Sequence, residues 1–82
     1  MRILVEVVTP GNGKTYELML DDKLTVGAAK EKMIEEIQSF ENGCIGFDEI
    51  VALFSPTSRA ILPDNRNLRK VGLRGGQTVF LL

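Results

Sequence analysis

The sequence of 82 residues has no histidine, a single cysteine, Cys44, and no long apolar run. Without histidine, a cysteine nucleophile lacks its usual base, and zinc sites, which use several Cys or His ligands, are not expected. A single cysteine excludes an internal disulfide, so we expect Cys44 to be structural or incidental in a reduced, cytoplasmic protein. The chain also lacks the roughly 18 consecutive apolar residues of a membrane span and the apolar core of a secretory signal.

The composition, with 44% hydrophobic and 26% charged residues, is that of an ordinary globular domain, and we expect a single domain over residues 1–82. The net charge of −1 hides an asymmetry, because residues 1–50 carry five basic and ten acidic side chains whereas residues 51–82 carry five basic and one acidic. A dipolar molecule suits docking onto a charged protein surface. Nucleic-acid binding is not expected, because the basic third has Phe54 and Phe80 as its only aromatic residues.

Hydrophobic periodicity predicts the secondary structure. The predicted elements, in chain order, are strands over residues 2–8 and 15–20, a helix over 26–40, strands over 49–54 and 59–62, a short helical turn over 67–71 and a strand over 77–82. The two first strands are joined at residues 10–13, which contain Asn-Gly, a strong hairpin signal. Thr25 is placed to cap the helix, and Gly43 and Gly46 follow its end.

The same periodicity predicts which side chains are buried. The expected buried positions are Ile3, Val5, Tyr16, Leu18, Leu20, Val26, Ala29, Met33, Ile37, Phe40, Leu73, Val79 and Leu81. A single helix can cover only one face of a sheet, so a ββαββ order predicts an α+β domain with one open sheet face.

Over essentially its whole length the chain resembles the ubiquitin-like β-grasp family. The start of the chain, residues 1–9, is similar to the first strand of ubiquitin. The other positions that carry the resemblance are Lys14, Thr15, Leu18, Leu20, Thr25, Val26, Ala29, Lys30, Lys32, Leu62, Asp64, Arg66, Leu68, Leu73 and Thr78. The resemblance implies a mixed sheet with one helix packed across one face. It leaves the function open, since β-grasp domains serve as tags, sulfur carriers and binding modules.

Residues 73–76 read Leu-Arg-Gly-Gly, the C-terminal ending of ubiquitin, and raise the question of covalent conjugation. Six residues follow Gly76, and they carry the best strand pattern in the C-terminal third. We therefore expect Leu73 in the core and residues 74–76 in a tight turn, where glycine adopts positive φ at little steric cost. Conjugation and sulfur carriage, which need a free terminal glycine, remain the less favoured functions.

Two other motifs suggest chemistry that their context does not support. The Gly-Lys-Thr at residues 13–15 lacks the preceding glycine of a phosphate-binding loop, since Val8 occupies that position, and a strand rather than a helix follows. The acidic pairs at residues 21–22 and 35–36 fall on a turn and on the outer helix face, where charged residues are usually solvated. We expect no enzymatic activity, no metal and no cofactor.

The open face of the sheet is the candidate binding surface. The residues expected there are the apolar Val8, Leu53, Phe80 and Leu82, edged by Arg59, Arg66 and Arg74. Apolar residues grouped on an open sheet face suggest a protein-binding patch, and these positions resemble those through which ubiquitin-like domains are commonly recognised. Cover by the chain's own loop at residues 41–49 is the alternative that the sequence leaves open.

The expected function is that of a non-covalent protein-interaction module. Among relatives without a conjugation tail, the chain looks most like the YukD type found with bacterial type VII (WXG100) secretion loci, which likewise end in a hydrophobic pair such as Leu81-Leu82. This resemblance implies an accessory role in secretion and a protein partner among the membrane components of that system. The alternatives are a ubiquitin-like subunit of a multicomponent monooxygenase and, less favoured, a covalent modifier or sulfur carrier. Weak self-association through the sheet is left open.

Overall fold

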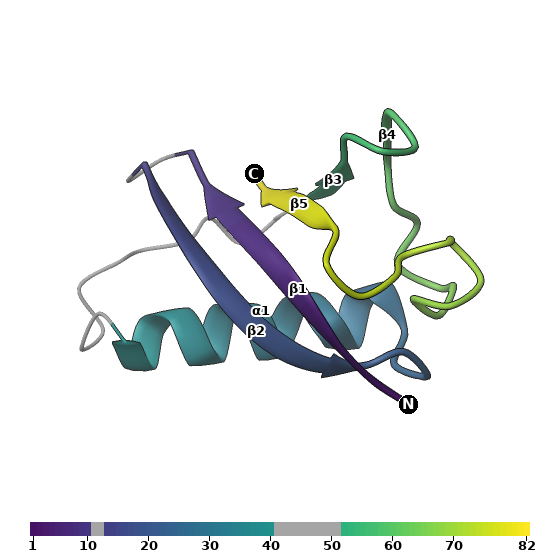
Figure 1. Ribbon diagram of the computed structural model, residues 1–82, viewed down its shortest axis with the longest axis horizontal. Coiled ribbons are helices and arrows are strands. Elements are labelled where there is room, and N and C mark those ends of the chain that lie inside the picture. Colours follow the sequence, from purple (N-terminus) through teal and green to yellow (C-terminus); the bar gives the residue numbers. More distant parts are fainter. Residues whose placement is uncertain (11–12, 41–51) are drawn as a thin grey trace.

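The computed structural model describes residues 1–10, 13–40 and 52–82. Its elements are β1 (Arg2–Thr9), β2 (Lys14–Asp21), α1 (Val26–Phe40), β3 (Leu53–Ser55), β4 (Ala60–Ile61) and β5 (Thr78–Leu81). The strands form one sheet in the order β2-β1-β5-β3-β4, and α1 crosses one face of it (Figure 1). β1 and β5 are parallel, and the other neighbouring strands are antiparallel. The predicted α+β fold is confirmed. The strand predicted over residues 59–62 is present as the short β4, and counting it makes the order ββαβββ rather than ββαββ.

Some predictions concern residues outside the described ranges. These are Asn12 of the predicted hairpin turn, the glycines Gly43 and Gly46, Cys44, the loop at 41–49, and residues 49–51 of the predicted third strand. None of the helices in the described part of the chain is long and apolar enough to cross a membrane.

The helix begins as the sequence predicts. The Thr25 hydroxyl accepts a hydrogen bond from the Ala28 N–H at 3.1 Å, which satisfies one of the free donors at the first turn. The apolar stripe of α1 then packs on the sheet through four side chains with no exposed area, Val26, Ala29, Met33 and Ile37. The prediction that Phe40 continues this stripe is wrong, because Phe40 is 64% exposed. It lies at the end of the helix and stacks on Tyr16 of the edge strand β2, with ring centroids 6.1 Å apart.

The core lies between α1 and the inner face of the sheet. Val5, Val7 and Val79 are completely buried, and the chain after β4 adds Leu62, Leu68 and Leu73. The sequence correctly predicted the inward side chains of β1, β2 and β5 from their two-residue period.

The side chains of β3 point to the opposite faces of the sheet from those predicted. Leu53 was expected on the open face, but it is completely buried and pairs with Leu81, which also points into the core. Directly paired residues on neighbouring strands share a face, and alternation then places Phe54, not Leu53, on the open face. Phe54 accordingly pairs with Phe80.

The Leu-Arg-Gly-Gly segment forms a turn within the fold. The Gln77 N–H donates to the Arg74 carbonyl at 3.3 Å, and Gly76, with φ of 84°, occupies the position that requires a positive φ in a type II turn. The Gly76 N–H also donates to the Leu4 carbonyl of β1 at 2.7 Å. The predicted turn is confirmed, and the glycine pair is fixed against β1 where β5 is about to begin.

In this turn, Gly75 and Gly76 should differ in how well they tolerate substitution by alanine. Gly76→Ala should lower the free energy of unfolding by about 1 kcal/mol, because alanine is strained at positive φ. Gly75→Ala is the matched control, since a Cβ there meets Ile3 at an ordinary 3.8 Å, and its effect should stay within about 0.5 kcal/mol. Urea denaturation of both variants measures the difference, and equal effects would contradict the turn assignment.

The corrected facing of β3 also has a measurable consequence. Leu53→Ala should lower the free energy of unfolding by about 2–4 kcal/mol, because it leaves a cavity in a fully buried site. Leu82→Ala, at a side chain that is 57% exposed, should change it by no more than about 0.5 kcal/mol. A Leu53→Ala protein as stable as the Leu82→Ala protein would show that Leu53 is not a core residue.

Candidate protein-binding surface

Four apolar side chains form one row across the face of the sheet opposite α1. Val8 of β1 pairs with Phe80 of β5, Phe80 pairs with Phe54 of β3, and Phe54 pairs with Ile61 of β4. We call Val8, Phe80, Phe54 and Ile61 the apolar row. Their chain neighbours Val7, Val79, Leu53 and Leu62 are buried, so alternation along each strand directs the row away from the helix.

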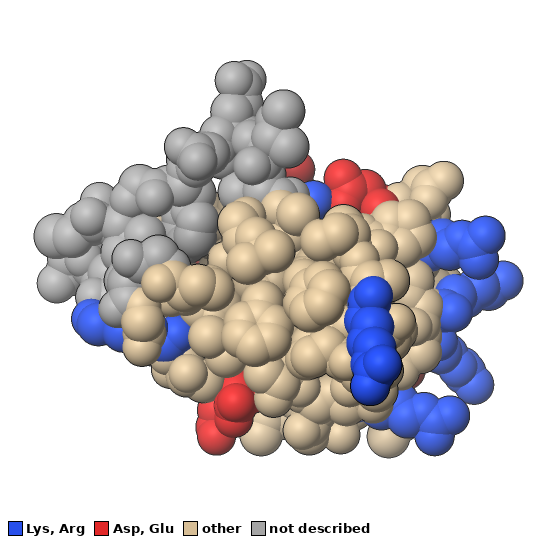
Figure 2. All heavy atoms as spheres, turned by 90° about the horizontal axis from the view of Figure 1, so that it is seen from above, with Lys and Arg blue, Asp and Glu red and all other residues tan. Residues whose placement is uncertain are grey.

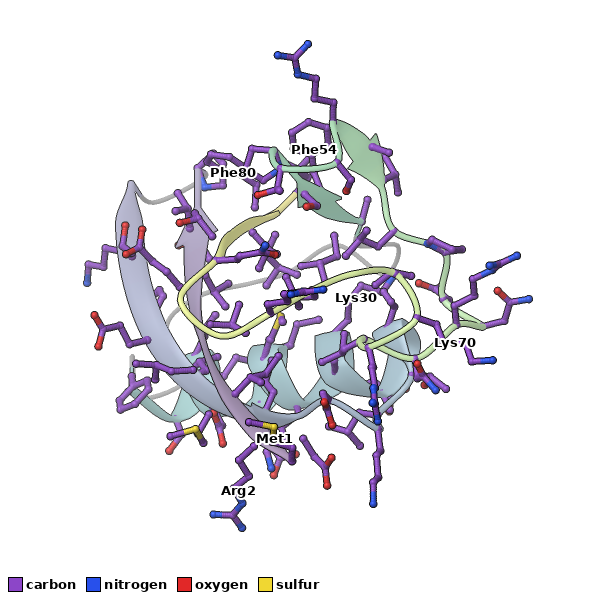
Figure 3. All side chains as sticks on the ribbon, turned by 45° about the vertical axis from the view of Figure 1, so that its right-hand side comes forward. Met1, Arg2, Lys30, Phe54, Lys70 and Phe80 are labelled. Carbon is purple, nitrogen blue, oxygen red and sulfur yellow. The ribbon has the colours of Figure 1, made fainter. Side chains whose placement is uncertain are left out.

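The two phenylalanines lie at the middle of the row. Their ring centroids are 6.2 Å apart and the rings are tilted by 38°, a separation at which aromatic pairs attract each other. Figure 3 shows both rings on the side of the sheet away from α1. Val8, Phe54 and Phe80 are partly exposed, whereas Ile61 is 53% exposed. The row therefore presents its aromatic centre and its β4 end to solvent.

Leu82 extends the apolar row by one register position. Its N–H and carbonyl exchange hydrogen bonds with Ala52 at 2.9 and 3.1 Å, so the pairing of β5 with β3 continues beyond the last strand residue. Leu82 is 57% exposed and lies two residues after Phe80, on the same face. Val8, Phe80 and Leu82 are thus on the open face, as predicted, and they are joined there by Phe54 and Ile61, which were not predicted.

Polar residues limit the apolar row along the strands. Glu6 pairs with Glu17 on one side and with Thr78 on the other, and the Thr78 hydroxyl donates to a Glu6 carboxylate oxygen at 3.3 Å. Beyond them on the same face is a second apolar pair, Leu4 and Met19, which are 43% and 49% exposed. The carboxylates of Glu6 and Glu17 therefore separate two apolar areas of the open face.

Of the three arginines expected at the edge of this surface, one lies beside the apolar row. Arg59 is in the turn between β3 and β4, two residues before Ile61, and has a φ of 56°. Arg66 lies at the start of α1, where its carbonyl accepts the Val26 N–H at 2.8 Å. Arg74 lines a hollow with Met1 and Ile3, at the opposite end of β1 from Val8. The structure therefore does not bring Arg66 and Arg74 to the edge of the row.

The acidic pair at residues 21–22 has structural partners. The Asp21 carboxylate accepts the Lys23 N–H at 2.9 Å, and this backbone hydrogen bond lowers the pKa of Asp21. Asp22 accepts a hydrogen bond from the N-terminal ammonium at 3.2 Å. Across the residues that the structure describes, no group of three Asp, Glu, Cys or His side chains could hold a metal ion. Lys14 and Thr15 begin β2, as expected of a hairpin rather than a phosphate-binding loop.

A comparison of the sequence with protein-family models gave no match, and neither did a comparison with curated protein sequences. Solved structures do match. The ubiquitin-like domain of EccD5 from Mycobacterium xenopi has a TM-score of 0.81 at 12% identity, over 100% of this chain and 93% of that chain. For the ubiquitin-like domain of Plasmodium falciparum Dsk2 the TM-score is 0.77 at 23% identity, over 99% and 96%.

The ubiquitin of Caldiarchaeum subterraneum is a third similar structure, with a TM-score of 0.72 at 21% identity over 99% of this chain and 91% of that chain. In each case the likeness extends over nearly the full length of both chains, at identities that show the fold alone. The mixed sheet, the single crossing helix and these likenesses agree. The chain has the ubiquitin-like β-grasp fold.

Proposed function

We propose that this chain is a non-covalent protein-interaction module that binds its partner through the apolar row. The observation that carries the proposal is the pairing of Val8, Phe80, Phe54 and Ile61 across four strands on the face that α1 leaves uncovered. An apolar group of this kind, limited by charged residues, is typical of a binding surface. Two aromatic side chains at its centre supply the large contact area that binding hot spots use.

Conjugation through Gly76 is disfavoured by the position of the glycine pair. Cleavage after Gly76 would remove β5, the strand that lies between β1 and β3. It would also remove Val79 and Leu81 from the core, and each such side chain contributes on the order of 2–4 kcal/mol. A small domain has about 5–15 kcal/mol of stability in total, so a chain cleaved there would not stay folded.

The proposed setting is a bacterial type VII (WXG100) secretion system, in which the chain would be a cytoplasmic accessory component. The sequence resemblance to YukD-type proteins supports this setting. The shared fold with the ubiquitin-like domain of EccD5 from Mycobacterium xenopi, over 100% of this chain, adds a bacterial structure to that support. The alternative is a ubiquitin-like subunit of a multicomponent monooxygenase.

Arg59 adds a charged group to the surface at a cost in backbone energy. A non-glycine residue in the left-handed region costs about 1–2 kcal/mol, and Arg59 is the one such residue in the described part of the chain. Strain of this kind often marks a functional position. We therefore include Arg59 in the proposed surface, where its guanidinium would meet a carboxylate of the partner.

Partner capture tests the apolar row. Capture by Phe54→Ala and Phe80→Ala proteins should fall at least about tenfold, as expected for an aromatic hot spot. Leu4→Ala is the matched control, because Leu4 is exposed on the same face beyond Glu6 and Glu17, and it should capture as the unmodified protein does. The measurement is quantitative mass spectrometry of material crosslinked in cells of the source organism. Capture that is equal in all variants would contradict the apolar row as the binding surface.

The identity of the captured proteins separates the two settings. The secretion role predicts a membrane ATPase or a polytopic channel protein encoded beside WXG100 genes. Di-iron hydroxylase subunits would instead support the monooxygenase alternative. Inspection of the genes that flank this one distinguishes the two settings in the same way.

Substitution of Arg59 should weaken partner binding without lowering the free energy of unfolding. Arg59→Gly should leave the free energy of unfolding unchanged or raise it by up to about 1 kcal/mol, because glycine adopts positive φ without strain. Affinity for the captured partner should fall about twofold to fivefold, as when one exposed ion pair is lost. Ser58→Gly in the same turn is the control and should not weaken binding. Loss of both stability and affinity in Arg59→Gly would mean that the side chain has a structural role instead.

A further inference from the structure

Lys and Arg side chains gather at one end of the molecule, away from the apolar row. Figure 2 shows this concentration at the end where Figure 1 places the chain between β4 and β5. Four cationic side chains line two adjoining hollows of the surface, and we call them the basic pole. The residues of the basic pole are Lys23, Arg69, Lys70 and Arg74.

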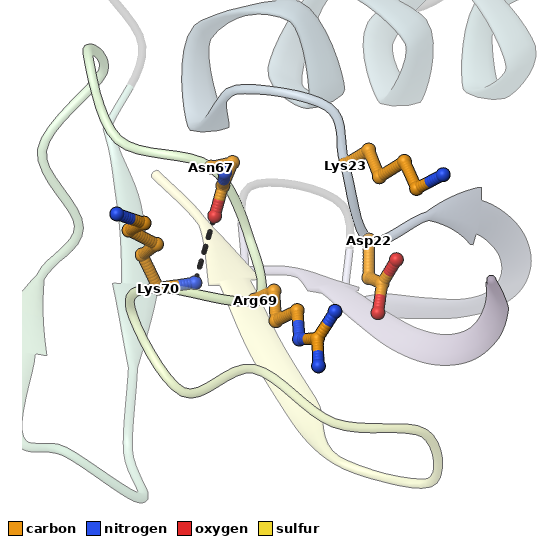
Figure 4. Close-up of a pocket in the computed structure, with 5 residues that line it drawn as sticks. All are labelled: Asp22, Lys23, Asn67, Arg69 and Lys70. Atoms are coloured by element: carbon orange, nitrogen blue, oxygen red, sulfur yellow. Dashed lines mark hydrogen bonds between the residues drawn. The ribbon is translucent and has the colours of Figure 1, made fainter.

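The two hollows join around Arg69. The first is lined by Lys23, Asn67, Arg69 and Lys70, together with Asp22 (Figure 4). The second is lined by Asp22, Arg69 and Arg74 beside the glycine-rich segment 72–75. Because both include Asp22 and Arg69, the two hollows adjoin, and we call them together the groove.

Backbone hydrogen bonds hold the two segments that carry these cations together. The Leu68 N–H donates to the Leu24 carbonyl at 2.9 Å, and the Arg69 N–H donates to the Asp22 carbonyl at 3.0 Å. The Asn67 side chain accepts the Lys70 N–H at 2.8 Å and closes the turn (Figure 4). The side chains of the basic pole thus extend from a fixed backbone, which reduces the entropy lost on binding.

The charges of the basic pole are not neutralised within the described residues. Three carboxylates lie near it in the fold. Asp21 accepts the Lys23 N–H and lies close to the Lys23 charge, and the other two have partners outside the basic pole. Asp22 pairs with the N-terminal ammonium at 3.2 Å, and Asp64 pairs with Lys30 at 2.7 Å. Within the ranges that the structure describes, the side chains of the basic pole form no ion pair and no side-chain hydrogen bond. The charges of Arg69, Lys70 and Arg74 are therefore available to a ligand, and the charge of Lys23 is partly offset by Asp21.

We propose that the basic pole binds an acidic segment, rich in Asp and Glu, of a protein partner. Arginine binds carboxylates through two parallel hydrogen bonds, and Arg69 and Arg74 both line the second hollow. A membrane surface fits less well, because membrane-binding segments combine cations with several exposed apolar side chains, and the groove has Met1 alone among the large exposed apolar residues. Nucleic acid fits less well because no aromatic side chain lines the groove to stack on a base.

This second surface is independent of the apolar row. Ile3, which lines the groove, and Val8, which belongs to the row, are five residues apart on β1, a separation of about 17 Å in a strand. A peptide that occupies the basic pole therefore leaves the row accessible. The two surfaces can be tested separately, and failure of one does not decide the other.

The test is titration of the isotopically labelled protein with a synthetic peptide of six glutamates interspersed with glycine and serine, followed by amide chemical shifts. The shifts should be confined to residues 2–4, 22–24 and 67–75, which line or adjoin the groove. The Arg69→Gln/Lys70→Gln protein should bind at least about fivefold more weakly, as when two exposed ion pairs are lost. Lys14→Gln/Lys32→Gln removes the same charge at two exposed positions outside the groove and should bind within about twofold of the unmodified protein.

Four results would overturn the proposal. One is equal weakening in both double variants, which would show attraction by net charge alone. The second is shifts spread over all basic residues. The third is binding to vesicles of phosphatidylglycerol and phosphatidylcholine without binding to the peptide, which would make the surface a membrane contact. The fourth is a concentration-dependent shift of the same amides without peptide, which would identify a second copy of the chain as the ligand. Phe54→Ala/Phe80→Ala should bind the peptide normally, and weaker binding by that protein would contradict the independence of the surfaces.

Discussion

The pairing of β5 with both β1 and β3 is the interaction on which the rest of this structure depends. Parallel to β1 and antiparallel to β3, β5 joins the two ends of the chain in the middle of the sheet. Its inward residues, Val79 and Leu81, complete the core beneath α1. Its outward residue Phe80 lies between Val8 and Phe54 and makes the apolar row continuous. The Gly75–Gly76 turn is the entry to this strand, which is why a sequence that reads as a conjugation ending is an internal structural element.

The parts of the fold that the sequence predicted are those where one side of an element differs chemically from the other. The alternation in β1 and β2 and the three-to-four spacing in α1 each identify a buried face, and the structure agrees with them. The third strand was different, because Ala52, Leu53 and Phe54 are all apolar and a two-residue period cannot tell which of them is buried. The pairing of Leu53 with Leu81 and of Phe54 with Ile61 determines that Leu53 is the buried residue. The sequence of one strand does not show which residues of the neighbouring strands it pairs with. The prediction that Phe40 is buried was wrong for a related reason, because periodicity does not show where a helix extends past the edge of the sheet.

The location of the candidate site on the open face of the sheet was predictable, but not all of the residues that form it were. An open sheet face follows from the prediction of a single helix. Val8, Phe80 and Leu82 followed from the two-residue alternation around the first and last predicted strands, residues 2–8 and 77–82. Ile61 was missed because a two-residue strand carries too little pattern to assign a face. Arg66 and Arg74 are close to β5 in sequence, but the turns between β4 and β5 direct that segment toward the start of α1 and the beginning of β1. The same turns bring Arg69 and Lys70 together with Lys23, from the other half of the chain, in the basic pole.

The central claim is that the apolar row is where a protein partner binds. Cross-saturation NMR on a complex of the methyl-labelled protein with its captured partner tests it most directly, because saturation passes only to methyl groups in contact with the partner. We predict strong transfer to the methyl groups of Val8, Ile61 and Leu82, and little transfer to Leu4 and Met19 on the same face. Transfer to Leu4 and Met19 with none to Val8 and Ile61 would contradict the account.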